Sequence, residues 1–168
     1  MTVGLIGLGN ILLGDEGVGV HVVRAIGEKY IFSPEIEIID GGTLGLDLLS
    51  LFEKFDKVLI IDAVNFGKEP GYVGILEDDN IPAVIFSNKL SVHHIGLANV
   101  LSAAKLMGVI PSKVCLIGIQ PSSVEFDFGL EMSNVMNANI EKMIDLAIKK
   151  LKEWNIECAL RSPQESLT

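Results

Sequence analysis

Short apolar runs alternate along this chain with longer segments in which apolar residues recur every three or four positions. Short runs of this kind are typical of buried strands, and the longer repeats are typical of one face of a helix. Strands are predicted at 3–8, 36–39, 58–61, 72–76 and 114–119. Helices are predicted at 18–30, 44–52, 95–107 and 132–154. Polar and glycine residues surround 72–76, which favours a place at the edge of a sheet.

Strands that alternate with helices in this way predict an α/β fold, in which helices cover both faces of a layered sheet. The 168 residues fit one domain, and an apolar content of 49% allows a substantial core. We assign residues 1–158 to this domain. Residues 159–168 are largely polar and show no period, so we expect a frayed C-terminal tail there. Sheets of this class bind ligands at the carboxyl ends of their strands.

The charge balance excludes two classes of partner. The chain carries 13 Lys and Arg against 22 Asp and Glu, a formal net charge of −9. Nucleic acid and anionic membranes attract cationic surfaces, so we expect neither as a partner. The longest uncharged stretch, residues 90–104, is too short to cross a membrane, and the N-terminus lacks the basic start of a signal peptide. We therefore expect a cytoplasmic protein.

A glycine-containing turn follows the first predicted strand. Gly7-Leu8-Gly9-Asn10 resembles the start of a dinucleotide-binding turn, and Asp40 at the end of the second strand could hold a ribose. Leu12, however, stands where that pattern requires its third glycine. The sequence therefore favours glycines that serve a tight turn over a dinucleotide site.

Acidic residues follow the first three predicted strands. Asp15 and Glu16 come after the first, Asp40 ends the second and Asp62 ends the third. Each has a simple structural explanation, with Asp15 as a helix cap, Asp40 as a turn former and Asp62 as a loop residue. Together they would form an electronegative pocket at one edge of the sheet, which is costly unless a cation binds there.

Two of the three histidines, His93 and His94, are adjacent just before a predicted helix, whereas His21 is expected to face solvent on the first helix. A helix N-terminus keeps imidazole neutral, as a metal ligand must be. One histidine with Glu and Asp gives an oxygen and nitrogen ligand set that suits Zn, Ni, Mn or Fe. Composition and periodicity do not by themselves select the three ligands.

Five blocks of sequence resemble the [NiFe]-hydrogenase maturation proteases, the endopeptidases that remove the C-terminal peptide of the hydrogenase large subunit. They occur in the family's order: GLGNILLGDEGVG at 7–19, DGGT at 40–43, IIDAV at 60–64, SVHHIGL at 91–97, and GIQP at 118–121 followed by GL at 129–130. The resemblance runs from the first predicted strand to the final helix. It implies a single-domain three-layer α/β/α fold with a twisted, mostly parallel sheet of about five strands.

The resemblance also implies site residues. The metal-binding and catalytic positions of the family carry over to Glu16, Asp62 and His93, and the position of His94 is not among them. The metal is expected to be nickel carried by the substrate, the precursor of the large subunit, with Zn or Cd able to substitute in vitro. We expect the enzyme to be a monomer.

The sequence supports neither a serine or cysteine nucleophile nor a zincin site. There is no Gly-x-Ser-x-Gly or HExxH motif, and Cys115 lies in an apolar run that predicts a buried thiol, so neither cysteine is favoured as a nucleophile. Whether Asp15 or Asp40 acts as a general base stays open. The alternative functions are a non-enzymatic nickel-binding checkpoint or chaperone for hydrogenase assembly, and a nucleotide-binding α/β domain.

Overall fold

The structure is a computed structural model that describes residues 1–43, 45–87, 92–123 and 127–163, with the side chains of 86, 87 and 92–96 left undescribed. The strands are β1 (Val3–Leu8), β2 (Tyr30–Ser33), β3 (Glu37–Gly42), β4 (Lys57–Ala63), β5 (Val73–Glu77), β6 (Lys113–Ile119) and β7 (Glu157–Leu160). The helices are η1 (Gly14–Gly17), α1 (Val18–Lys29), α2 (Leu48–Lys54), α3 (Asn80–Ser87), α4 (Val92–Met107) and α5 (Asn134–Glu153).

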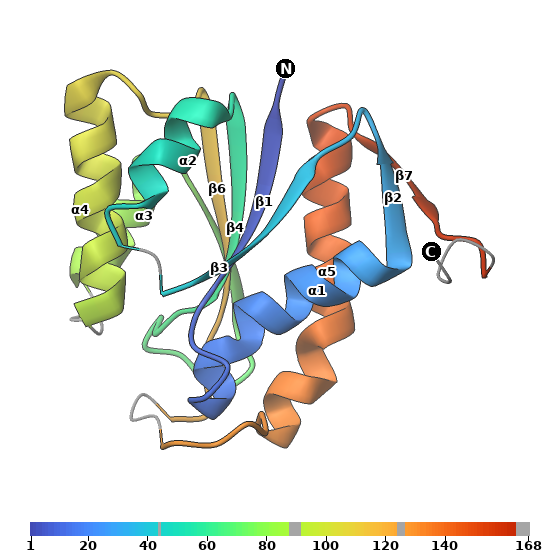
Figure 1. Cartoon of the computed structure of the whole chain (residues 1–168). Helices are drawn as coiled ribbons and strands as arrows, with labels where there is room; N and C mark the ends of the chain where they lie inside the picture. Colours follow the sequence, from blue (N-terminus) through green and yellow to red (C-terminus); the bar gives the residue numbers. More distant parts are fainter. Residues whose placement is uncertain (44, 88–91, 124–126, 164–168) are drawn as a thin grey trace.

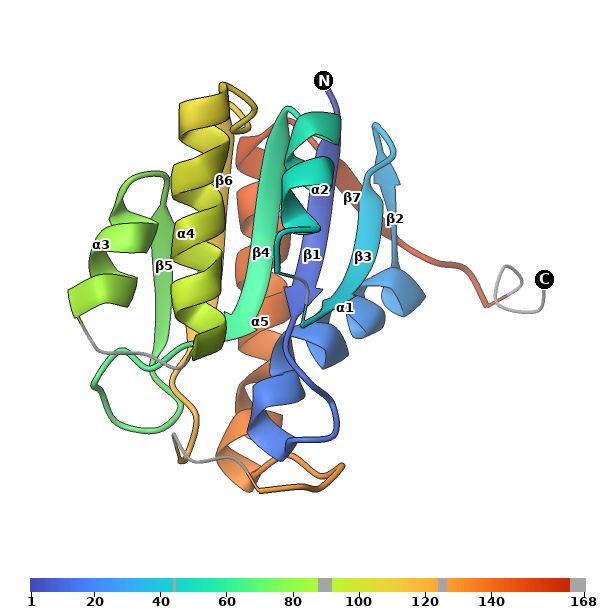
Figure 2. The ribbon, with the colours of Figure 1, turned by 60° about the vertical axis from the view of Figure 1, so that its left-hand side comes forward.

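Five strands form one twisted sheet in the order β3-β1-β4-β6-β5. The pairs β1–β3, β1–β4 and β4–β6 are parallel, and β5 runs antiparallel to β6 at the edge. Figures 1 and 2 show α1 and α5 on one face of this sheet and α2, α3 and α4 on the other. The mostly parallel three-layer α/β/α fold and the edge position of the 72–76 strand are therefore confirmed.

Side-chain alternation along the central strands builds two cores. On β4, Leu59 and Ile61 pack with the core under α1 and α5, whereas Val58 and Ile60 pack with the core under α2, α3 and α4. Successive residues of a strand point to opposite faces, so a strand covered on both sides must be apolar at every position. This requirement explains why unbroken apolar runs, and not alternating ones, marked β1, β4 and β6.

A separate two-stranded ribbon, β2 with β7, was not predicted. Tyr30 begins β2 and does not continue α1, in keeping with the preference of the Tyr30-Ile31-Phe32 run for strands. Ala159 and Leu160, which were expected in the tail, pair with Ile31 and Tyr30 in this ribbon. Each strand of the ribbon has four residues, too few to show a period in the sequence.

Two helices also differ from the prediction. Helix α3, between β5 and α4, was missed, and α2 begins at Leu48, four residues later than expected. Residue 44, the expected start of α2, lies outside the described residues. In the described part of the chain, no helix combines the length and apolar character needed to cross a membrane.

Candidate active site

The carboxyl ends of the parallel strands point to the end of the molecule opposite the N-terminus (Figure 2). The segment from β1 to α1 and the segment from β6 to α5 lie side by side there, and the N-terminal end of α4 points the same way (Figures 1 and 2). Asp15, Glu16, Asp40 and Asp62 belong to these strand ends or to the segments that follow them, whereas His93 and His94 belong to α4.

The turn after β1 places Glu16 close to the sheet. Gly9 has a φ of +118°, and a Cβ there would lie 1.8 Å from the carbonyl oxygen of Glu16. Only glycine allows this approach of two backbone segments. The short helix η1 that contains Glu16 contacts β4 directly, and Glu16 is buried, with 8% of its surface exposed. The tight-turn role of the glycines is therefore confirmed.

Helix α1 sits unusually close to the same strand ends because of a second glycine. A Cβ on Gly19 would lie 2.1 Å from the carbonyl oxygen of Ile61 and 2.4 Å from that of Leu8. The helix backbone therefore rests on the backbones of β1 and β4. This contact fixes the start of α1, and η1 before it, against the strand that carries Asp62.

Asp62 is fully buried near the end of β4, with no exposed surface. It alternates with Ile60 and Val64, which pack in the core beneath α2, α3 and α4. Asp62 therefore faces the layer that contains α4. It is not the loop residue that its position in sequence also allowed.

His93 and His94 lie in the first turn of α4, which begins at Val92, earlier than the predicted start at 95. Their side chains lie outside the described residues. Among the residues whose side chains the structure describes, no group of three or more His, Cys, Asp or Glu forms a candidate metal site. The three-ligand set of Glu16, Asp62 and His93 thus stays a prediction.

Asp15 does not cap α1; it joins η1 to the segment between β6 and α5. Its carboxylate accepts hydrogen bonds from the backbone N–H and hydroxyl of Ser122, at 3.1 and 2.7 Å, and from those of Ser133, at 2.7 and 2.9 Å. Burial raises the pKa of Asp15, but the four hydrogen bonds outweigh it and hold that pKa below its usual value. The N-cap residue of α1 is Gly17.

Asp40 is engaged elsewhere. Its carboxylate accepts a hydrogen bond from the Arg24 guanidinium at 2.5 Å and one from the backbone N–H of Gly42 at 3.2 Å. Its side chain is 42% exposed. Glu16 and Asp62 thus both lie buried at the strand ends, whereas Asp40 lies in the edge strand β3 and forms an ion pair with Arg24; convergence of the carboxylates stays a prediction.

His21 was expected to face solvent, and this is wrong. The side chain is half-buried, and its Nε2 atom is buried without a hydrogen-bond partner among the described residues. Burial lowers the pKa of His21, and the positive charge of Arg24 lowers it further, while Asp40 acts in the opposite direction. Val18 and Ala25, three residues before and four residues after His21 in α1, are buried and partly buried, and this spacing was a signal of partial burial that the sequence contained.

Cys115 is buried in β6, as predicted, and burial raises the pKa of its thiol to about 12. A thiol with such a pKa supplies almost no thiolate at neutral pH and is a poor nucleophile. Cys158 is half-buried in β7, in the ribbon and not at the strand ends that hold Glu16 and Asp62.

Gln120 also organises this end of the molecule, although the sequence suggested no role for it. Its side-chain oxygen accepts hydrogen bonds from the backbone N–H groups of Phe66 at 2.7 Å and Lys68 at 3.3 Å. Its amide nitrogen donates to the side chain of Asn65 at 3.2 Å. Gln120 is 4% exposed and therefore ties the segment after β4 to the end of β6. The sequence also contained no sign of the roles of Ser122 and Ser133, because Asp15, to which both bind, is 107 and 118 positions away from them in the chain.

Comparison with known proteins gives consistent matches. The family model described as hydrogenase maturation protease matches residues 20–150. The chain is 40% identical to the hydrogenase 2 maturation protease of Escherichia coli (strain K12), over 96% of this chain and 97% of the relative. It is 38% identical to the hydrogenase expression/formation protein HupD of Rhizobium leguminosarum bv. viciae, over 94% of this chain and 77% of the relative.

Solved structures agree with the sequence matches. The hydrogenase-maturating endopeptidase HybD from E. coli is similar with a TM-score of 0.88 at 37% identity, covering 96% of this chain and 98% of that one. The [NiFe] hydrogenase maturation protease HybD from Thermococcus kodakarensis is similar with a TM-score of 0.71 at 25% identity, covering 90% and 99%.

Proposed function

Because this chain belongs to the hydrogenase maturation protease family and is thus an endopeptidase, we propose that it removes the C-terminal peptide of a nickel-loaded [NiFe]-hydrogenase large-subunit precursor. The observation that carries this proposal is the burial of Glu16 and Asp62 at one end of the sheet, in a chain 40% identical to a hydrogenase 2 maturation protease. We further propose that it acts as a monomer in the cytoplasm.

In this proposal Glu16, Asp62 and His93 recognise the nickel ion that the substrate carries. Two carboxylates and one imidazole form a donor set that suits nickel and leaves coordination positions for the ligands of the substrate. Burial of both carboxylates supports the assignment, since buried carboxylates are stabilised by a cation. The first turn of α4, which holds His93, belongs to the layer that Asp62 faces.

Hydrolysis of a peptide bond requires a polarised carbonyl group and an activated water molecule. Asp15 is a weak candidate for the general base, because its two oxygens accept four hydrogen bonds that favour the charged form. Asp40 is held by Arg24 at the edge strand. We therefore assign water activation to the carboxylates of Glu16 and Asp62, next to the ion they recognise.

Incubation of the purified enzyme with the nickel-loaded precursor from the same organism tests the proposal. Mass spectrometry should detect loss of the C-terminal peptide with the wild type, and no loss with Glu16→Gln, Asp62→Asn or His93→Gln. Circular dichroism and thermal melting would establish that each variant is folded. Binding of the precursor by the wild type without loss of mass would instead support a checkpoint or chaperone.

The two adjacent histidines supply a matched control for the metal assignment. Titration with nickel, or with zinc or cadmium as surrogates, should show binding that weakens sharply in His93→Gln and stays within about threefold of wild type in His94→Gln, because one ligand has been removed in the first case only. The reverse ranking would assign the ligand to His94. Equal large losses would show that both rings serve the metal.

A further inference from the structure

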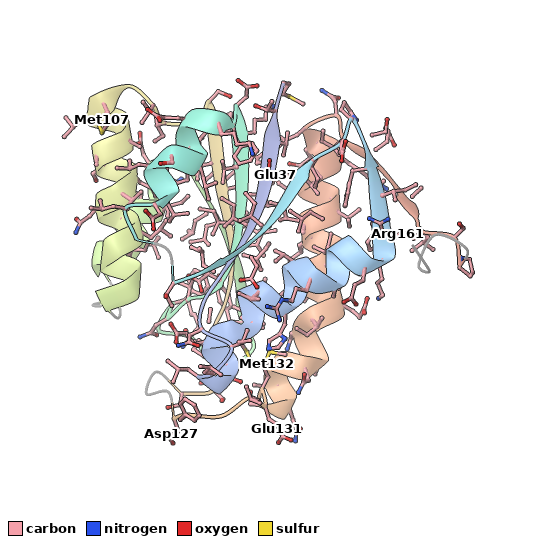
Figure 3. The ribbon with its side chains drawn as sticks, viewed as in Figure 1. Glu37, Met107, Asp127, Glu131, Met132 and Arg161 are labelled. Carbon is pink, nitrogen blue, oxygen red and sulfur yellow. The ribbon has the colours of Figure 1, made fainter. Side chains whose placement is uncertain are left out.

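Three exposed apolar side chains gather where two loops meet at the end of the molecule that holds Glu16. Leu12 is 41% exposed, Phe128 is 81% exposed and Leu130 is 66% exposed. Asp127 and Glu131, both exposed, flank Phe128 and Leu130 in the chain and lie at the same extremity in Figure 3. We call these five residues the loop surface.

The loop surface has a fixed framework. The backbone N–H of Gly129 donates to the carbonyl oxygen of Leu12 at 2.7 Å, and that of Gly14 donates to the carbonyl oxygen of Gly129 at 2.8 Å. The four hydrogen bonds to Asp15 join the same two segments a few residues away. The backbone that carries the apolar side chains is therefore held in place before any partner binds, which reduces the entropy cost of binding.

A cavity of about 340 Å³ adjoins this framework. Its lining includes Asp15, Asp127, Glu131 and Ser133. Asp15, which lines this cavity, directly precedes Glu16 in η1.

The charge of the loop surface indicates the chemistry of its partner. Neither Asp127 nor Glu131 forms an ion pair with a described residue, and the whole chain carries a net charge of −9. Exposed aromatic and leucine side chains beside carboxylates complement a segment that presents an apolar side chain next to Lys or Arg. A second copy of this chain fits poorly, because a twofold interface would bring the same carboxylates together.

We propose that the loop surface docks the substrate protein, through a segment that presents an apolar side chain beside a basic one. The identity of this partner rests on the proposed function, whereas the position and chemistry of the surface do not. Docking here would anchor the substrate outside the active site. Changes to the loop surface should therefore raise KM and weaken binding, and should leave kcat near its wild-type value.

The test measures binding of the nickel-loaded large-subunit precursor to the immobilised full chain by interferometry, and its processing by mass spectrometry. The double variants Phe128→Ser with Leu130→Ser, and Asp127→Lys with Glu131→Lys, should each bind the precursor at least about tenfold more weakly than the wild type, as expected for central contact residues. Both should reach a near-normal kcat at high precursor concentration.

Matched controls lie at the opposite end of the molecule. Leu106 and Met107, at the C-terminal end of α4, are 90% and 61% exposed, so Leu106→Ser with Met107→Ser removes a similar apolar surface. Glu35→Lys with Glu53→Lys changes the net charge by the same amount as the acidic double variant. Binding and processing should stay within about twofold of wild type in both controls.

Each outcome separates docking from catalysis. If the wild type binds and cuts the precursor and the loop-surface variants do the same with unchanged affinity, docking is wrong and the proposed function stands. If the wild type binds without cutting and the loop-surface variants lose binding, the proposed function is wrong and docking stands. A wild type that neither binds nor cuts overturns both. A wild-type dimer that Phe128→Ser with Leu130→Ser dissociates, with precursor binding unchanged, identifies a self-association surface and overturns docking.

Discussion

The carboxylate of Asp15 accepts hydrogen bonds from both the backbone N–H and the hydroxyl of Ser133, 118 positions later in the chain. Ser133 is also the N-cap residue of α5, but its hydroxyl donates to Asp15 and makes no capping bond. The start of the last helix is thus attached to η1, which carries Glu16. This attachment makes the geometry of the active site depend on a contact between the two ends of the domain.

Ser133→Ala should lower the free energy of unfolding by about 1.5–3 kcal/mol, because a hydrogen bond to a charged group contributes about that much. Urea unfolding measures the loss. The hydroxyl of Ser112 bonds to a neutral carbonyl oxygen, that of Asp56, so Ser112→Ala should cost less, about 0.5–1.5 kcal/mol.

The partner of the Ser133 hydroxyl can be checked by a double-mutant cycle. In an Asp15→Asn background the further change Ser133→Ala should cost clearly less than in the wild type, because the charged acceptor is gone. Equal losses in the two backgrounds would show that the Ser133 hydroxyl acts through another contact.

Gly19→Ala should disturb the active site, because it adds a methyl group where α1 rests on the backbone of β4. The added Cβ would lie 2.1 Å from the carbonyl oxygen of Ile61, the residue before Asp62, and backbone cannot move aside cheaply. We expect a loss of about 1–3 kcal/mol in unfolding free energy, typical of overpacking, and a loss of processing in the protein that stays folded.

The same helix offers a control for Gly19. A Cβ on Gly27 would meet only a side-chain carbon of Ile38 at 3.5 Å, an ordinary contact. Gly27→Ala should therefore keep full processing and raise stability by about 0.5–1 kcal/mol through helix propensity. Thermal melts and precursor assays on both variants give the comparison, and a Gly19→Ala enzyme with normal activity would contradict the close-contact explanation.

The central fold could be predicted because its causes are local in sequence. Strands β1, β4 and β6 are buried on both faces, so each is a continuous apolar run that the sequence shows directly. The ribbon of β2 and β7 could not be found in this way, because its strands are short and largely exposed. Its paired residues are also at least 124 positions apart in the chain.

The site was predictable only in part. Glu16 and Asp62 follow or end buried strands, and parallel strands bring such positions to one end of a sheet, so topology was enough to place both there. The hydrogen bonds between Asp15 and its serines depend on where a distant segment returns, which no local pattern encodes. Asp40 lies near the carboxyl end of its strand as predicted, but its pairing with Arg24 depends on the tertiary position of α1 and could not be foreseen.

The stability of the enzyme should depend on pH through His21. Burial and Arg24 lower the pKa of His21 below its ordinary value of 6.5, and Asp40 opposes this only in part. His21 therefore binds a proton less readily in the folded state than in the unfolded state. As pH falls below 6.5 and then through the lowered pKa of folded His21, protonation favours the unfolded state and the protein loses stability. The stabilising effect of a neutral His21 is fully present above pH 6.5.

Urea midpoints of the wild type and His21→Gln, measured between pH 8 and pH 5, test this linkage. The wild type should lose more stability than the variant as pH falls below about 6.5, and the difference between the two should be constant above it. Both proteins keep His93 and His94, so these histidines cancel in the comparison to first order. Parallel curves over the whole range would show that His21 titrates alike in the folded and unfolded states.

Neither cysteine should be needed for catalysis. Cys115 lies in the core of β6 with its thiol pKa raised to about 12, and Cys158 lies in the ribbon. Cys115→Ser should cost about 1–3 kcal/mol of unfolding free energy, because the hydroxyl is more polar than the thiol in an apolar site. Cys158→Ser should cost less than about 0.5 kcal/mol, since the side chain is only half-buried.

The folded double variant should process the precursor at the wild-type rate, as measured by mass spectrometry at a temperature well below its melting point. Iodoacetamide should label Cys158 readily and Cys115 only when the protein unfolds, which provides a direct check of burial. A folded double variant that binds the precursor but leaves it uncut would assign a cysteine to the reaction and remove Glu16 and Asp62 as sufficient activators of water.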